Sequence, residues 1–161
     1  MTADDFRQLY EYHFTLNRRV WERSVMALTD EQFTRKLGYS VGSVRNQCVH
    51  MLNIDDRWFS GLRGVEVPGF LNPVYFRKRV VIRERWDSVE ADMRAYLSTL
   101  SDEHLDQPFE EGLKVWQVLF HVLNHGTDHR AQLLAMLNQL GAPTFPQDYF
   151  FFAVGKDPKP R

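Results

Sequence analysis

The chain of 161 residues has little of what marks several common classes of protein. It holds a single cysteine, Cys48, which excludes an intramolecular disulfide and indicates a reducing compartment. It contains no stretch of about 18 apolar residues that would span a membrane, and no basic start followed by an apolar segment that would suggest a secretory signal. Its 20 basic and 21 acidic side chains nearly cancel, so the charge pattern typical of nucleic-acid binding is missing. We therefore expect a cytoplasmic protein with neither a membrane nor a nucleic acid as partner.

Apolar residues recur at three- and four-residue spacing in four long segments, which is the pattern of amphipathic helices. These segments span residues 4–28, 44–59, 76–100 and 113–140. The stretch 61–73 contains glycine and proline and predicts a long connection between the second and third helices. We predict one all-α domain over residues 1–161, a four-helix bundle with a long crossover between helices two and three.

A short sequence recurs after the first and third long helices. The segment Leu28-Thr-Asp-Glu-Gln-Phe33 reappears 72 residues later as Leu100-Ser-Asp-Glu-His-Leu105. Its Thr29 and Gln32 form a potential capping box for a short helix. Either both copies are simply good helix starts, or the chain consists of two similar helix pairs about a pseudo-two-fold axis. The second interpretation places the position 72 residues after His50 beside the histidines of the last helix.

Half of the six histidines lie within nine residues of the last long helix, at His121, His125 and His129. Residues four apart project from the same helix face, so two imidazoles at this spacing can share a metal ion. A single histidine on an apolar face is more often a hydrogen-bonded core residue. Three rings on one stripe need partners for all their nitrogens, because an unpaired buried polar group costs about 1–3 kcal/mol. A metal ion supplies such partners, and we expect these side chains to point into the bundle.

Other residues complete or flank this site. His50, on the second long helix, is the natural third ligand, because bundle metal sites are built from inward side chains of facing helices. His13 fits a hydrogen-bonded core histidine better than a ligand, and His104 follows a helix start and is expected to face solvent. Cys48 lies about 160° from His50 on the helical wheel, so the two do not face one metal.

The combined pattern resembles the DinB/YfiT-like superfamily over roughly residues 5–152. Its most specific element is His125-Gly-Thr-Asp-His129-Arg-Ala-Gln132, with an isolated histidine at position 50 about 75 residues earlier. The resemblance implies a four-helix bundle, often dimeric, in which His50, His125 and His129 bind a divalent metal. His121 matches no ligand position of that family and is assigned a supporting or structural role. The family usually has glycine where this chain has Ala131, a small difference that the helix contact should tolerate.

Three neutral histidines around zinc leave one coordination position open, as in catalytic zinc sites. Such a metal can hold and deprotonate a thiol, or it can lower the pKa of bound water and support hydrolysis. The resemblance favours a thiol S-transferase that uses a low-molecular-weight thiol such as bacillithiol, mycothiol or glutathione on a small electrophile. The alternatives are a metal-dependent hydrolase and a non-catalytic, stress-related metal-binding module whose site is closed by a fourth ligand such as His121. Zinc is the expected metal, and nickel can replace it in purified samples.

Side chains near the ligands are candidates for further roles. Asp128 and Asn17 are the catalytic candidates, and Asp128 can instead be an exposed acid or an intrahelical partner. Arg130 and Gln132 are the candidates for binding a cofactor, although Arg130 can also simply face solvent. Aromatic residues make up 14% of the chain, more than one small core readily absorbs, which predicts an exposed apolar surface and a homodimer. The aromatics in question are Trp21, Trp58, Phe59, Phe70, Tyr75 and Phe76.

Overall fold

The computed structural model describes residues 1–159, and helices carry its architecture. Four helices are long: α1 (Ala3–Arg23), α3 (Val44–Leu62), α4 (Arg79–Thr99) and α6 (Val115–Gln139). The short elements are η1 (Val25–Ala27), α2 (Asp30–Thr34), η2 (Pro73–Tyr75), α5 (Asp102–Leu105), η3 (Glu110–Gly112) and α7 (Tyr149–Ala153). Residues 1–159 contain no β-strand, so the predicted all-α class is confirmed.

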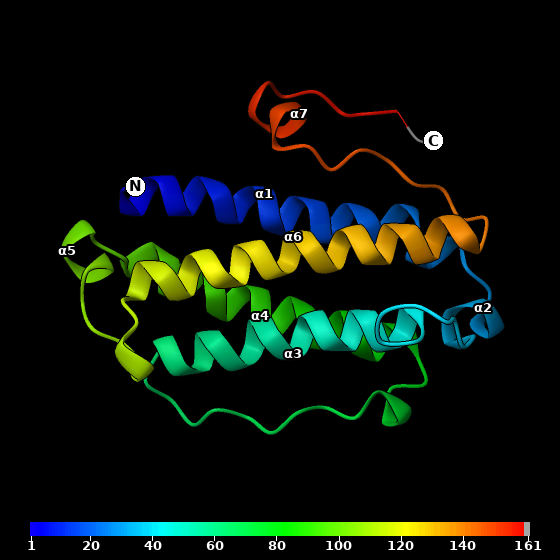
Figure 1. Cartoon of the computed structure of the whole chain (residues 1–161), viewed down its shortest axis with the longest axis horizontal. Coiled ribbons are helices and arrows are strands. Elements are labelled where there is room, and N and C mark those ends of the chain that lie inside the picture. Colours follow the sequence, from blue (N-terminus) through cyan, green and yellow to red (C-terminus); the bar gives the residue numbers. More distant parts are fainter. Residues whose placement is uncertain (160–161) are drawn as a thin grey trace.

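The four long helices pack side by side. Helix α6 contacts α1 and α3, and α4 contacts the same two helices from the other side. In Figure 1, α1 and α6 run from left to right, whereas α3 and α4 both run from right to left. Residues 63–78 make this possible, because they return along the whole bundle before α4 begins. Helices two and three of the bundle are therefore parallel, as the long crossover predicted.

Local sequence signals mark several helix ends. Thr29 forms the expected capping box with Gln32, and Ser43 caps α3 by accepting from the backbone N–H of Asn46. Gly141 follows α6 with a φ of 78°, a left-handed conformation that glycine adopts without strain. The first helix is shorter than predicted, since it ends at Arg23 and the chain continues through the 3-10 turn η1.

The internal repeat has a structural counterpart. Thr29 and Ser101 stand 72 residues apart, and each caps a short helix, α2 and α5 respectively. Figure 1 places α2 and α5 at opposite ends of the bundle. Adding 72 to the residue numbers of α3 gives a range that lies within α6, its antiparallel neighbour. Adding 72 to those of α1 gives a range that overlaps most of α4. The arrangement agrees with two similar helix pairs related by a pseudo-two-fold axis.

The aromatic residues divide between the core and the surface. Trp21 and Phe59 are buried, whereas Phe70 and Tyr75 on the crossover are 66% and 81% exposed. Trp58 and Phe76 are partly buried against the core. No helix of the described residues is long and apolar enough to cross a membrane.

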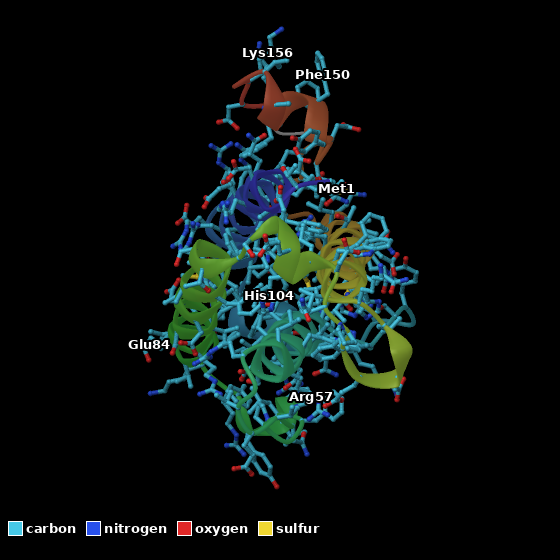
Figure 2. All side chains as sticks on the ribbon, turned by 90° about the vertical axis from the view of Figure 1, so that its left-hand side faces the viewer. Met1, Arg57, Glu84, His104, Phe150 and Lys156 are labelled. Atoms are coloured by element: carbon cyan, nitrogen blue, oxygen red, sulfur yellow. The ribbon has the colours of Figure 1, made fainter. Side chains whose placement is uncertain are left out.

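The C-terminal aromatic run lies on α1 through two of its rings. The Tyr12 ring lies 5.3 Å from that of Tyr149 and 5.7 Å from that of Phe152. Phe150 is 61% exposed, and Figure 2 shows it on the outer side of α7, away from the bundle. The run therefore packs on the bundle through Tyr149 and Phe152, whereas Phe150 faces away from it.

Candidate metal centre

Helices α3 and α6 bring three imidazole rings together. His125 and His129 are one turn apart on α6, and α3 packs along that face with His50 opposite them. The Nε2 atom of His50 lies 3.1 Å from Nε2 of His125 and 3.3 Å from Nε2 of His129. One ligand atom from each ring lies within 4.8 Å of the others. These three residues form what we call the histidine cluster.

The spacing of these nitrogens fits a divalent metal better than it fits hydrogen bonds alone. Zinc–nitrogen bonds of about 2.0–2.1 Å in a tetrahedral site place two ligand atoms about 3.3–3.4 Å apart. Hydrogen bonds cannot satisfy the same arrangement, because each neutral ring nitrogen either donates one proton or offers one lone pair. His50 Nε2 faces two other ring nitrogens, so one of the two contacts lacks a matched donor and acceptor. The donor set is therefore chemically suited to a shared cation.

The surroundings keep the cluster uncharged. Burial first, and then the neighbouring His129 and His50, lower the pKa of His125 to about 4. Burial and His129 lower the pKa of His50, and burial lowers that of His129, although Asp128 partly opposes this last effect. Neutral imidazole is the form that binds metals. All three rings are only half-buried, so the cluster is both ready to ligate and reachable from solvent.

Comparison with known proteins gives this arrangement a family context. The sequence model of the DinB family matches residues 1–159. The chain belongs to the DinB family. It is also 26% identical, over 155 aligned residues, to Protein DinB of Bacillus subtilis (strain 168), and the alignment covers 88% of this chain and 90% of that relative. The predicted resemblance is therefore confirmed, and the whole histidine cluster lies inside the matched region.

A buried glutamine holds one ring of the cluster in this DinB-family chain. Gln47 is fully buried on α3, and its Nε2 lies 2.7 Å from His129 Nδ1 and 3.1 Å from the His129 carbonyl oxygen. Its Oε1 accepts a hydrogen bond from Ser40, which also contacts Gln132. Sequence reasoning missed Gln47, although its place three residues before His50 puts it on a neighbouring part of the same helix face.

His125 is held differently. Its Nδ1 atom is buried and has no hydrogen-bond partner among the described residues. The ring lies 4.1 Å from that of His129 and 5.0 Å from that of His50, measured between centroids. Packing against the other two rings and the Nε2 contact with His50 therefore fix its orientation.

The candidates at positions 128 and 132 lie beside the cluster on its solvent side. Asp128 is exposed, and its carboxylate accepts a hydrogen bond of 2.9 Å from Gln132 Nε2. No imidazole of the cluster is hydrogen-bonded to it. The structure thus gives Asp128 the intrahelical partner that the sequence left open as an alternative. Gln132 links Asp128 to Ser40, and through Ser40 to Gln47.

Arg130 and Asn17 lie on another face of the helix and belong to a buried network. Arg130 is fully buried, so the alternative that it faces solvent is wrong, and its guanidinium donates to other side chains of the chain. Its Nη1 lies 3.1 Å from His13 Nδ1 and donates to Asn17 Oδ1 at 3.0 Å. Its Nε donates to Gln147 Oε1, and its Nη2 to Thr127 Oγ1. These contacts tie α1, α6 and the C-terminal segment together.

His13 is the core histidine that the sequence predicted, and it explains a glycine in the motif. Its Nε2 lies 3.5 Å from Asp55, which also accepts from the indole N–H of Trp86. A Cβ atom at Gly126 would lie 2.4 Å from His13 Cε1, far inside contact distance. Glycine at position 126 therefore allows α1 to approach α6 at the level of the histidine cluster.

Three further residues lie outside the cluster. His121 is exposed and does not join the three ligand atoms, contrary to the expectation that it points inward. Its ring lies 5.1 Å from that of Trp58 and 6.1 Å from that of His125. His104 is exposed, as predicted. Cys48 is buried, and burial raises the pKa of its thiol to about 12.

A groove of about 420 Å³ opens next to the cluster on the α3 side. Its lining comes from the C-terminal part of α3, the crossover, the start of η3 with the residue before it, and α6. The lining residues are Ile54, Arg57, Trp58, Gly61, Val67, Phe70, Phe109, Glu110 and His121. The groove therefore reaches the histidine cluster by way of His121.

Proposed function

We propose that this DinB-family protein is a divalent-metal-dependent enzyme that transfers a small thiol to small electrophilic molecules. The observation that carries the proposal is the convergence of three neutral imidazole nitrogens, from His50, His125 and His129, at a half-exposed position. Such a donor set is typical of catalytic zinc, which keeps one coordination position open. Zinc is accordingly the metal we propose.

When bound, a zinc ion favours the thiolate form of a thiol at its open position. The reaction is then a substitution: the thiol gives its proton to solvent, its sulfur bonds to the electrophilic carbon, and the leaving group departs with the bonding electrons. The protein's share is positioning. His50, His125 and His129 hold the metal, and Gln47 fixes the ring of His129.

The reacting sulfur is proposed to come from a small molecule and not from the protein. Cys48 is the only cysteine of the chain, and it is buried with a raised pKa, which makes it a poor nucleophile. A low-molecular-weight thiol such as glutathione, bacillithiol or mycothiol is the proposed second substrate. The electrophile is proposed to enter from the side of the crossover, where the groove adjoins the cluster.

A purely structural metal would need a closed site. His121 was the candidate fourth ligand, but it is exposed and lies outside the group of converging nitrogens. The cluster is also half-exposed on its remaining side. These observations support an open, reactive site over a metal that only braces α3 and α6.

The test is thiol consumption by the zinc-loaded protein with several low-molecular-weight thiols and a model aryl chloride. We expect consumption with at least one thiol, and loss of that activity in His125→Ala and after removal of the metal. His104→Ala and Cys48→Ser are matched controls and should keep full activity. Activity that survives His125→Ala but is lost in Cys48→Ser would contradict the proposal.

We also propose that the protein is a cytoplasmic homodimer. Tyr75 and Val74 on the crossover are 81% and 55% exposed and do not line the groove, which supports an apolar contact surface. Light scattering at about tens of micromolar protein should give twice the chain mass of 19.0 kDa, since two-fold dimers are the commonest soluble oligomers. A monomeric mass would contradict this part of the proposal.

A further inference from the structure

We propose that the groove beside the histidine cluster binds a planar, apolar molecule that carries one acidic group. The apolar body lies against Trp58 and Phe109, and the acidic group pairs with Arg57. That this molecule is the electrophile of the reaction rests on the proposed function. The binding site itself does not, because its residues are separate from the metal ligands.

The walls of the groove suit a flat apolar body. The rings of Trp58 and Phe109 lie 6.3 Å apart, and His121 stands edge-on to Trp58. Ile54 and Val67 add aliphatic surface. The volume of about 420 Å³ lies within the range of small-molecule sites. His121 connects this wall to His125, so a ligand in the groove lies beside the cluster.

Gly61 indicates that the space is kept open. It lies in the last turn of α3, where glycine weakens a helix relative to alanine. It does not have the positive φ that would favour glycine. A Cβ atom at this position would lie 3.2 Å from Phe109 Cζ and about 4.0 Å from a methyl group of Val67. A side chain here would therefore project into the groove between its two walls.

Arg57 supplies the charge. Its guanidinium lies 4.1 Å from the centre of the Phe70 ring and donates to the carbonyl oxygen of Pro68, which fixes it at the edge of the groove. Among residues 1–159, no carboxylate lies within ion-pair distance of it. Glu110, the other charged lining residue, is exposed at the rim. A half-buried cation without a counter-charge, beside aromatic walls, favours a ligand with an acidic group.

Two fluorescent probes that differ in one charge test the inference. Anilinonaphthalene sulfonate is flat, apolar and acidic, and N-phenylnaphthylamine lacks the sulfonate. We expect one molecule of the sulfonate to bind per chain. Arg57→Gln should weaken the sulfonate about tenfold and the neutral probe less than about twofold, because only the charged pair is lost. Arg35→Gln, at the end of α2 and outside the groove, is the matched control and should leave the binding of both probes unchanged.

Filling the groove should remove both probes. Gly61→Leu places a side chain between Phe109 and Val67. Because this side chain blocks the groove, we expect either probe to bind at least about tenfold more weakly. Val67→Phe fills the groove from the exposed crossover. It should weaken the binding of both probes in the same way without altering a helix. Phe120→Ser is the control, since Phe120 lines a separate groove between α1, α6 and the C-terminal segment.

The outcomes are distinct. Weaker binding in Phe120→Ser, with Gly61→Leu and Val67→Phe unchanged, would overturn the assignment of the groove. Equally weakened binding of both probes in Arg57→Gln would contradict the inference that the ligand carries an acidic group. The double variant His125→Ala/His129→Ala should bind both probes normally, so a failure of the metal hypothesis would leave these results intact. Loss of both probes in that variant would contradict a site separate from the ligands.

Discussion

Two polar clusters share helix α6 and differ in whether their atoms are satisfied. His129 belongs to the half-exposed histidine cluster, and its neighbour Arg130 to the fully buried network with His13 and Asn17. Every guanidinium nitrogen of Arg130 has a partner. In the histidine cluster, three ring nitrogens face one another and His125 Nδ1 has no partner.

The difference separates a structural role from a binding role. A buried network whose hydrogen bonds are complete stabilises and orients the elements that it joins. Ring nitrogens that face one another without a matched donor for every acceptor are unfavourable by themselves and gain most from an added cation. Successive residues of a helix point about 100° apart, so α6 presents one cluster to α3 and the other to α1.

The largest effect on stability is expected at the buried network. Arg130→Met removes the cation but keeps an apolar side chain of similar length, and it leaves His13, Asn17 and Gln147 without their donor. We expect the free energy of unfolding to fall by about 3 kcal/mol, because several buried polar groups lose their partner. Urea unfolding of the metal-free protein measures this loss.

The matched change in the histidine cluster is His125→Ala. It removes a ring that has no hydrogen-bond partner at Nδ1 and that crowds two others. We expect the metal-free protein to lose less than about 1 kcal/mol, within the range of partly exposed substitutions. Equal losses in Arg130→Met and His125→Ala would remove the distinction between the two clusters.

An intermediate effect is expected at the residue that orients His129. Gln47→Ala removes the side chain beside His129 Nδ1. A ligating His129 carries its proton on Nδ1, and the Gln47 amide accepts it by turning its Oε1 toward the ring, so we expect the variant to lose metal affinity about 10–100-fold. Asp128→Asn should change the affinity less than about threefold, because Asp128 is exposed and bonded to Gln132. Zinc competition with a chromophoric chelator measures both values. A larger loss in Asp128→Asn than in Gln47→Ala would reverse these roles.

A further effect is a pH dependence of the metal-free protein. Each ligand histidine has a folded-state pKa below the ordinary value of 6.5, and that of His125 is about 4. As the pH falls through 6.5, these histidines become protonated in the unfolded chain but stay neutral in the folded chain. The contribution of these groups to stability is therefore complete above pH 6.5 and is lost between 6.5 and about 4.

Urea unfolding at a series of pH values measures this dependence. The triple variant in which alanine replaces His50, His125 and His129 should lose less stability than the wild type over that interval. Metal affinity should fall in the same interval, because protons compete for the ligand nitrogens. An identical pH dependence in the triple variant would show that other groups cause the loss.

The sequence predicted the elements of the fold because helices depend on local signals. Apolar spacing predicted the four long helices, and the capping box at Thr29 predicted the start of the short helix α2. The end of α1 was predicted too late, because the apolar stripe continues through residues that form the turn η1. Helix α3 was predicted too short, since Gly61 was taken as a break although it stays helical.

The sequence could predict the metal ligands because their positions follow from helix faces. The histidines at positions 125 and 129 share a face by their spacing, and His50 was expected opposite them. Arg130 was misplaced because arginine usually faces solvent, and only the packing of α1 on α6 creates its buried partners. The groove depends on the path of the crossover and on Phe109, and no local pattern in the sequence indicates either.

Titration of zinc into the metal-free protein, followed by calorimetry, tests the histidine cluster most directly. We expect one ion per chain, with affinity at least about 100-fold weaker in each of His50→Ala, His125→Ala and His129→Ala, since each removes one of three ligands. His104→Ala, which changes an exposed histidine far from the ligands in sequence, should bind zinc as the wild type does. Unchanged affinity and stoichiometry in His125→Ala/His129→Ala would contradict a metal site between α3 and α6.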